Sequence, residues 1–577
     1  MEQSSADVRP VRGPINRYFA FTAKRSITER WLLHLLLIVI LFFAVSELLK
    51  FDDQFSQESP SAGGTLTEGI VGTPRFVNPV LAITRADQDM SALVYSGLMR
   101  LGADGELELD IARNITTTDA GRTYNVQLRE DVYFHDGTQL TASDVAYTIT
   151  LIQNPDLKSP LRGNWDGVLV EQLGEFELNI VLEEVYAPFI ENLTVGILPR
   201  DNWDELPIEQ LPFSQNNTQP VGTGPYTITD VTRNQSGLID SYTLSAADTY
   251  RGTANISTII FTFYTNEEEL VDALKTGAVM SSAGVSAEAL AQLDITESNL
   301  FTSPLPRTFA LYINQNKSAA LREASVREAL QAAIDREALI SDVLAGFGFA
   351  AETPVPPSYI ETPTATTSEL TDPLTKARGI LTADDWFLND DGRWQKEIGE
   401  DEFIELQIVL NTANTPLFGN TAEYVAEIWR TLGADVTVAQ FEQADLVQAI
   451  IRPRDYQMLL FGADVGRQLD LYPFWHSSQK DDPGLNIAQY TNIDVDAQLE
   501  SLRTATSSTE RTTLLQQINT DITADTPAIF LFTPTFGYVL HESINAAIPP
   551  RLNTPSERFS TIESWHITSD RVWPIFQ

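Results

Sequence analysis

Strand and helix patterns alternate along the chain from about residue 64 onward, and this alternation constrains the fold most strongly. TYNVQL (123–128) and ELNIVL (177–182) carry an apolar side chain at every second position, which is typical of half-buried strands. IIFTFY (259–264) is more continuously apolar and is expected to be buried on both faces. IFLFTP (529–534) predicts a further buried strand. With the helices described next, these strands predict an α/β protein of two or more lobes.

Helical segments lie between the predicted strands. SVREALQAAIDREALISDVLAG (325–346) has its apolar residues along one stripe and predicts a helix that ends at glycine. TAEYVAEIWRTLGADVTVAQF (421–441) predicts a helix, a turn at Gly433 and then a strand, and residues 510–525 predict another helix. Residues 352–373 are rich in proline and threonine, which favours a long surface loop.

An apolar run near the N-terminus, WLLHLLLIVILFFAVSELL (31–49), is about long enough to cross a hydrocarbon core of ~30 Å. Six basic residues precede it and acidic residues follow it, so the positive-inside rule predicts a single-pass helix with a cytoplasmic N-terminus and an extracytoplasmic remainder. A cleaved signal peptide is the alternative, because Ala44-Val45-Ser46 resembles a cleavage site. The polar residues 51–63 predict a short flexible stalk.

The charge and the residue content exclude several classes of function. The chain has 79 acidic and 38 basic side chains, a net charge of −41, and such a surface repels nucleic acid. There is no cysteine, hence no disulfide, no thiolate nucleophile and no cysteine-based metal site. The histidines are scattered singly, and we find no phosphate-binding loop, HExxH pair or GxSxG elbow. We therefore expect neither an enzyme nor a bound metal or cofactor.

The stretch YFHDGTQLTASDVAYTI (133–149) contains the most suggestive polar cluster. His135 beside Asp136 is compatible with a catalytic or metal site. A structural reading explains the same residues, since Asp136-Gly137 suits a turn and Thr141 with Asp144 resembles a capping box at the start of a helix. We favour the structural reading, with an apolar helical face after the cap.

This stretch also resembles a known family signature. DVYFHDGTQLTASDVAYTI is similar to "vkFHDGtplTAeDVvysi" of the family 5 extracellular solute-binding proteins, the oligopeptide-, dipeptide- and nickel-binding receptors of ABC importers. Further segments resemble that family in the same order: PRFVNPVLA (74–82), LVYSGLMRLGADGELELDIARNITTTDAGRTYNVQLRE (93–130), PVGTGPYTI (220–228), VREALQAAIDREALISDVLAGFG (326–348) and MLLFGADVGRQLDLYPFWHSSQ (458–479). The resemblance spans nearly all of residues 64–570.

The resemblance implies an α/β, periplasmic-binding-protein type II (Venus-flytrap) fold of two lobes with an extra subdomain, preceded by one N-terminal transmembrane helix. Closure of the lobes over ligand is the expected motion. The expected parts are a cytoplasmic segment 1–30, a transmembrane helix 31–49, a linker 50–63, lobe I at 64–84, 220–302 and 536–577, an extra subdomain 85–219 and lobe II at 303–535.

The resemblance also implies ligand contacts. In peptide-binding relatives an aspartate pairs with the ligand's α-ammonium, and the matching position is Asp464, at the end of Phe461-Gly462-Ala463-Asp464. Phe461 stands where the family usually has tryptophan. The family's following "DP" is altered, which makes Asp470 a substitute candidate. A turn aspartate is the alternative for Asp464.

Three more candidates come from the same resemblance. Arg307 is a candidate partner of a ligand carboxylate, or a member of a structural salt bridge. Trp475 is a candidate pocket wall, or a core residue. Tyr95, in the second resembling segment, completes the set of substrate-binding candidates.

The function implied is that of a membrane-anchored, monomeric binding protein that captures peptides and delivers them to the permease and ATPases of an ABC transporter. Two alternatives stay open. One is the same fold binding a non-peptide solute such as a nickel chelate or an oligosaccharide. The other is a peptide-sensing or chaperone protein at the cell surface with no transport role.

Overall fold

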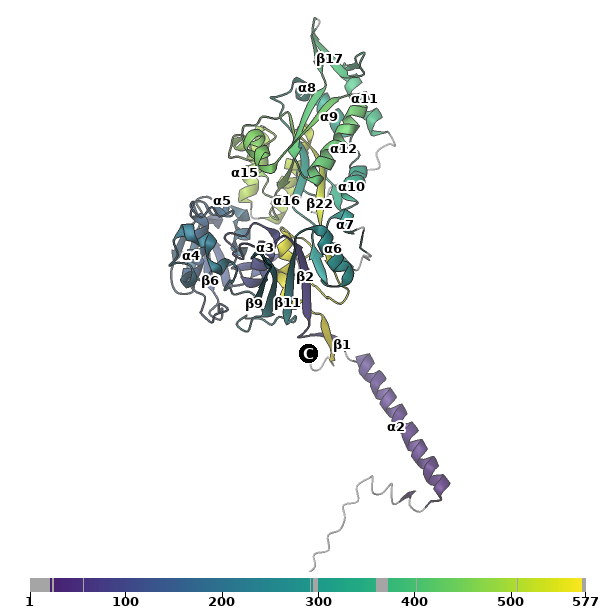
Figure 1. Ribbon diagram of the computed structural model, residues 1–577. Helices are drawn as coiled ribbons and strands as arrows, with labels where there is room; N and C mark the ends of the chain where they lie inside the picture. The colour runs from purple at the N-terminus through teal and green to yellow at the C-terminus, as the bar shows by residue number, and fades with distance from the viewer. Residues whose placement is uncertain are drawn as a thin grey trace, which may run out of the picture. The chain divides into compact units, whose positions relative to one another are not determined.

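The structure is a computed structural model of the chain, and it describes residues 21–572 except 23–24, 56, 291, 294–298, 358, 360–371, 401 and 506. The chain divides into two compact units, one formed by residues 1–61 and 568–577 and the other by residues 62–567 (Figure 1). Most of the loop predicted at 352–373 lies outside the described residues, as do residues 1–20 of the predicted cytoplasmic segment.

The first unit contains helix α2 (Ile27–Phe55) and a two-stranded antiparallel sheet of β1 (Gln57–Ser61) and β23 (Thr568–Val572). Large apolar side chains from Trp31 to Phe43 along α2 are exposed. Within the described part of the chain, none of the helices has the length and apolarity needed to span a membrane. The polar residues predicted to be a flexible stalk instead belong largely to the end of α2 and to β1, because β1 pairs with β23.

The second unit is built on one twelve-stranded mixed sheet. Its strand order is β20-β19-β21-β14-β22-β12-β2-β11-β10-β9, and β13 and β15 also pair with β22. The strands are β2 (Thr65–Val71), β9 (Tyr226–Arg233), β10 (Ile239–Ala246), β11 (Thr258–Tyr264), β12 (Ser281–Ala283), β13 (Leu300–Pro304), β14 (Arg307–Ile313), β15 (Gly348–Ala350), β19 (Gln407–Ala413), β20 (Asp435–Phe441), β21 (Met458–Asp464) and β22 (Ala528–Leu540).

The long strand β22 connects two halves of this sheet (Figure 1). Its first residues pair with β14 and its last residues pair with β12 and β13. We call the half built on β2 and β9–β12 lobe I, and the half built on β14 and β19–β21 lobe II. The buried side chains form a large core and a smaller one beside α6 in lobe I, and two cores in lobe II. The predicted residue boundaries of the lobes stay a prediction.

Lobe I also carries smaller sheets and short helices. The pair β3 (Met99–Leu101) and β4 (Leu107–Leu109) lies beside a four-stranded antiparallel sheet in the order β5-β6-β8-β7. The strands of that sheet are β5 (Ala112–Thr118), β6 (Thr123–Leu128), β7 (Leu169–Gln172) and β8 (Glu177–Val181). The main helices are α3 (Arg85–Val94), α4 (Ala142–Gln153) and α6 (Glu267–Thr276), with 3₁₀ segments η2 (Ala187–Thr194) and η9 (Pro555–Ser564).

Lobe II has more helices than lobe I, and they surround its part of the sheet. They include α9 (Ala324–Ala332), α10 (Arg336–Leu344), α11 (Pro373–Ala383), α12 (Pro416–Leu432), α14 (Tyr472–Trp475), α15 (Ile493–Thr504) and α16 (Ser508–Asp525). A small antiparallel sheet of β16 (Phe387–Leu388), β17 (Trp394–Gly399) and β18 (Glu402–Glu405) completes this lobe (Figure 1).

Most of the predicted elements are confirmed, and two need correction. The single helix predicted over 325–346 is two helices, because the Asp335 side chain accepts a hydrogen bond from the Ala338 amide at 3.0 Å and starts α10 afresh. The strand predicted over 259–264 is present as β11, but only one face is fully buried: Ile259 and Phe261 are buried, whereas Ile260 is half-buried. The helix, Gly433 turn and strand over 421–441 are present as α12 and β20.

Candidate functional site

The segment from Asp464 to Asp470, predicted to bind ligand, lies where the two lobes contact each other. Arg467 of lobe II donates a hydrogen bond to the Glu557 carboxylate of lobe I at 2.6 Å. Tyr186 of lobe I donates its phenolic hydrogen to Asp470 of lobe II at 2.9 Å. This segment therefore carries side chains that bridge the lobes.

Asp470 is held by protein groups on two sides. Arg503 of α15 donates to both oxygens of its carboxylate, from Nε at 3.1 Å and from Nη2 at 2.7 Å. The Arg503 guanidinium also lies over the rings of Tyr186 and Tyr472. Burial, with Asp470 as the next cause, raises the pKa of Tyr186, so its hydroxyl stays a donor at neutral pH. The geometry makes Asp470 a link between the lobes.

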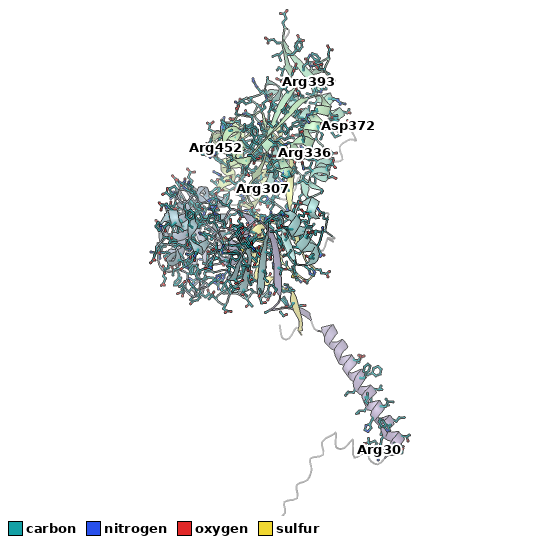
Figure 2. All side chains as sticks on the ribbon, in the orientation of Figure 1. Arg30, Arg307, Arg336, Asp372, Arg393 and Arg452 are labelled. Carbon is teal, nitrogen blue, oxygen red and sulfur yellow. The ribbon has the colours of Figure 1, made fainter. Side chains whose placement is uncertain are left out.

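Asp464 and Arg307 were predicted separately, and the fold pairs them with each other. They are register partners at the ends of β21 and β14, and Arg307 Nη2 lies 2.8 Å from Asp464 Oδ2 (Arg307 is labelled in Figure 2). Both side chains are more than two-fifths exposed. The arrangement fits the salt-bridge alternative for Arg307. A ligand role for either residue stays a prediction.

The residues that precede Asp464 lie along the same strand. Phe461 is half-buried and its ring stacks near Phe418, with centroids 6.3 Å apart. Ala463 is buried, and a side chain at Gly462 would come into tight contact with the ring of Phe309. Phe461, Gly462 and Ala463 thus build the strand that carries Asp464.

Trp475 lies in a hydrophobic core of lobe II. It is 1% exposed and packs against Tyr312, Tyr490 and Phe530. The core alternative given above explains this contact set, and Trp475 does not line any of the five cavities described in the molecule.

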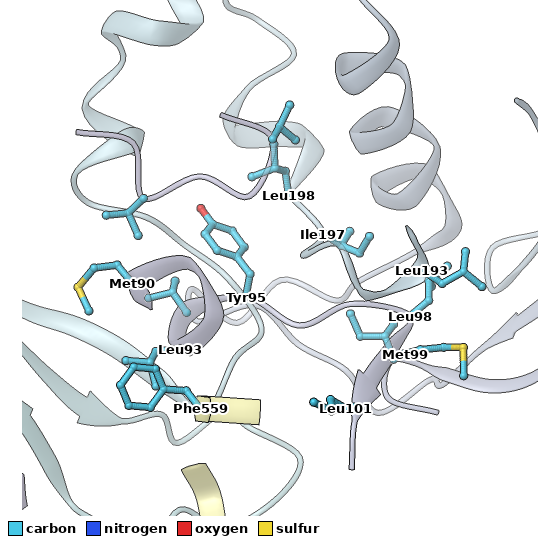
Figure 3. Close-up of a cluster of buried hydrophobic side chains, with 14 of the residues drawn as sticks. Met90, Leu93, Tyr95, Leu98, Met99, Leu101, Leu193, Ile197, Leu198 and Phe559 are labelled. Atoms are coloured by element: carbon cyan, nitrogen blue, oxygen red, sulfur yellow. The ribbon is translucent and has the colours of Figure 1, made fainter. Parts of the chain in front are cut away.

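Tyr95 lies in the core of lobe I, just after α3, among the apolar side chains shown in Figure 3. Glycines make room for it: a Cβ at Gly196 would lie 2.6 Å from the Tyr95 Cβ, and one at Gly222 would lie 2.9 Å from the ring. Its hydroxyl is buried and has no hydrogen-bond partner among the described residues. Gly222 of the segment PVGTGPYTI (220–228) therefore leaves the space that the Tyr95 ring occupies.

His135, in the stretch His135-Asp136-Gly137, forms hydrogen bonds with the glycine segment 222–224. A ring nitrogen of His135, Nε2, lies 3.0 Å from the Gly224 carbonyl, and the His135 amide donates to the Gly222 carbonyl at 2.8 Å. The Thr141 amide donates to the Asp144 carboxylate at 2.8 Å, which forms the predicted capping box of α4. The structural reading of this stretch is therefore confirmed.

A cavity of about 430 Å³ opens beside Tyr95, within the usual size range of ligand pockets. It is walled by the end of α3, β3, η2 and η9. Its polar lining includes Tyr95, Arg100, Asp110, Glu191, Asn192, Asn553, Ser556, Glu557, Ser560 and Glu563. A second cavity of about 270 Å³ shares Tyr95 and Glu191 with it.

Glu191 joins this cavity to the contact between the lobes. Asn553 Nδ2 donates to its Oε2 at 3.0 Å, and Gly466 of the lobe II segment lies close to the same oxygen. Burial raises the pKa of Glu191 to about 7, although Arg467 opposes the shift. Glu191 and Glu557 were not predicted, because in a chain with 79 acidic side chains no local pattern distinguishes a single glutamate, and Asn553 was not predicted either.

Comparison with known proteins identifies the family. The pattern of "Bacterial extracellular solute-binding proteins, family 5 Middle" matches residues 106–483. This chain belongs to that family. The oligopeptide-binding protein AppA of Bacillus subtilis is 26% identical over 538 residues, which cover 90% of this chain and 96% of that protein. The nickel-binding periplasmic protein of Escherichia coli is 27% identical over 401 residues, 67% of this chain and 72% of that protein.

Solved structures share the fold. The structure of Bacillus subtilis AppA in complex with a nonapeptide matches with a TM-score of 0.67 at 25% identity, covering 88% of this chain and all of that one. NikZ from Campylobacter jejuni in complex with Ni(L-His) matches with a TM-score of 0.65 at 22% identity, covering 87% and 99%. The fold is thus the mixed α/β fold of periplasmic binding proteins.

Proposed function

We propose that this protein is an extracytoplasmic receptor that captures peptides between its lobes and passes them to the permease of an ABC importer. The observation that carries the proposal is the match to oligopeptide-binding AppA, which extends over nearly the whole of both chains. The described site fits a binding role, since a partly polar cavity lies beside the contact between two lobes. No step of this role requires the protein to act as an enzyme.

Closure of the lobes would bring ligand and protein together. Two chain segments connect the lobes in one place, the turn from β13 to β14 and the middle of β22. Each contains prolines at the crossing, Pro304 and Pro306 in the first and Pro534 in the second. Two short connections leave hinge bending as the available motion, and the Tyr186–Asp470 and Arg467–Glu557 contacts would form as the lobes close.

We further propose that the protein acts as a monomer at the cell membrane, held by residues 31–49 with the N-terminus in the cytoplasm. The sequence pattern supports this, because a basic segment precedes an apolar run and acidic residues follow it. Protease treatment of intact cells tests the orientation. Digestion of residues 62–567 from outside, with protection of the N-terminal segment, is the expected result.

A second candidate function is capture of a non-peptide solute, which the resemblance to a nickel-binding periplasmic protein favours. Among the described residues, no group of three or more histidine, aspartate or glutamate side chains is placed to hold a metal ion directly. A metal would then have to enter as a chelate.

Native mass spectrometry of the purified full-length protein distinguishes these candidates. Peptides of mixed sequence that co-purify with the protein are the expected result. A single non-peptide mass, with no binding of added peptides, would replace the peptide proposal with the second candidate.

A further inference from the structure

The cavity beside Tyr95 holds one carboxylate that no basic side chain pairs with in the described structure. Four acidic residues line it, and three of them have arginine partners: Glu563 with Arg100, Asp110 with Arg251, and Glu557 with Arg467. The fourth is Glu191. Glu191 forms no ion pair in the described part of the chain, although Arg467 and Arg511 lie close enough to act on it electrostatically.

The unpartnered buried atoms around Glu191 include acceptors, hydroxyls that can donate or accept, and one donor, Arg467 Nε. Glu191 Oε1 and Asn553 Oδ1 are buried, and within the described part of the chain no group donates a hydrogen bond to either of them. Asn553 Oδ1 can only accept, and so can Glu191 Oε1 above pH 7, where this carboxylate is ionised. The buried hydroxyls of Tyr95 and Ser560, which line the same cavity, have no partner among the described residues either. A ligand group rich in donors and positive in charge would satisfy the two acceptors, Glu191 Oε1 and Asn553 Oδ1.

The surroundings of Glu191 explain why such a group would be bound strongly. The carboxylate is removed from bulk water, so its charge is poorly solvated, and Arg467, which acts on it electrostatically, is already engaged with Glu557. Arg511 also lies near, but it donates to the carbonyls of Leu502 and Gln468. An ammonium has three donors and a guanidinium five, and neither accepts a hydrogen bond.

We infer that Glu191 binds a cationic group of the ligand, an ammonium or a guanidinium, inside this cavity; where that group is a lysine or arginine side chain, the receptor prefers basic peptides. The inference rests on the proposed peptide-binding function and adds the chemistry of one subsite. The cation can come from a lysine or arginine side chain or from the peptide's own α-ammonium. In either case Glu191, Asn553 and Tyr95 provide the acceptors.

The test is isothermal titration calorimetry of the full-length protein at pH 8 with synthetic alanine-based pentapeptides. The peptides carry lysine, arginine, leucine or glutamate at the second position, each with a free or an acetylated amino terminus. The wild type should bind at least one cationic form about tenfold or more tightly than its neutral counterpart, the ratio that one charge-assisted hydrogen bond gives. Sensitivity to acetylation assigns the α-ammonium, and sensitivity to lysine against leucine assigns the side chain.

The variant Glu191→Gln should abolish this ratio. The variant Glu171→Gln is the matched control, because Glu171 is exposed on β7 and is not among the residues that line either cavity. Tyr95→Phe removes one acceptor and should lower the ratio a few-fold, which keeps the inference testable if Glu191→Gln does not fold.

Three outcomes would overturn the inference, and they separate the role of Glu191 from the proposed function. Equal affinity for cationic and neutral peptides in the wild type, or an unchanged ratio in Glu191→Gln, refutes the role of Glu191 while peptide binding stands. No binding of any peptide refutes the proposed function, and the subsite falls with it.

Discussion

The Tyr186→Phe substitution tests whether the contact between the lobes stabilises the closed form. Phenylalanine keeps the ring under the Arg503 guanidinium and removes only the hydroxyl, which donates to Asp470 across the lobes at 2.9 Å. The Arg503–Asp470 pair within lobe II stays intact. A hydrogen bond to a charged acceptor contributes about 1.5 kcal/mol or more, so the closing equilibrium constant should fall about tenfold.

Fluorescence energy transfer between the lobes measures this equilibrium directly. The chain has no cysteine, so dyes can be placed at Leu169→Cys and Ile398→Cys, two exposed positions in lobe I and lobe II, without competing thiols. Peptide affinity should fall by up to the same factor, because ligand must then supply the lost closing energy. Tyr242→Phe is the control, since the Tyr242 hydroxyl donates to the Thr218 carbonyl within lobe I. An unchanged closing equilibrium in Tyr186→Phe would refute the role assigned to this contact.

Three further predictions follow from the charged groups. Asp464→Asn should change the free energy of unfolding by less than about 1 kcal/mol, because its pair with Arg307 is exposed. A loss of peptide binding free energy above about 1 kcal/mol in calorimetry would then indicate that Asp464 contacts the ligand. Arg558→Met should lower the free energy of unfolding in urea by about 3–5 kcal/mol, since it leaves the fully buried Glu68 and Asp89 unpaired, and a loss below about 1 kcal/mol would contradict this account. The folded pKa of Glu191, about 7, is above its unfolded value of 4.5, so the folded state holds the proton more tightly and stability falls as pH rises from about 4.5 to 7. Glu191→Gln should therefore raise the melting temperature at pH 8 relative to the wild type but not at pH 4.5, and an equal shift at both values would reject the assignment.

Local features could be predicted from the sequence because they depend on neighbouring residues. Alternation of apolar side chains gave β6 and β8, and the Gly433 turn between α12 and β20 follows from the left-handed conformation that glycine adopts easily. The capped helix after the HDG stretch is local in the same way. The break at Asp335 was missed because a continuous apolar stripe suggested one helix, whereas the side-chain cap of α10 competes with the backbone there.

The site itself was decided by tertiary structure. Of the predicted ligand residues, Arg307 and Asp464 became partners only because β14 and β21 are paired in register, and Asp470 met Tyr186 only because the lobes contact each other. The sequence by itself determined an α/β chain of solute-binding type and the local elements of its lobes. Only the fold selected Glu191 as the unmatched carboxylate, because charge pairing and burial depend on residues such as Asn553, which lie hundreds of positions away along the chain.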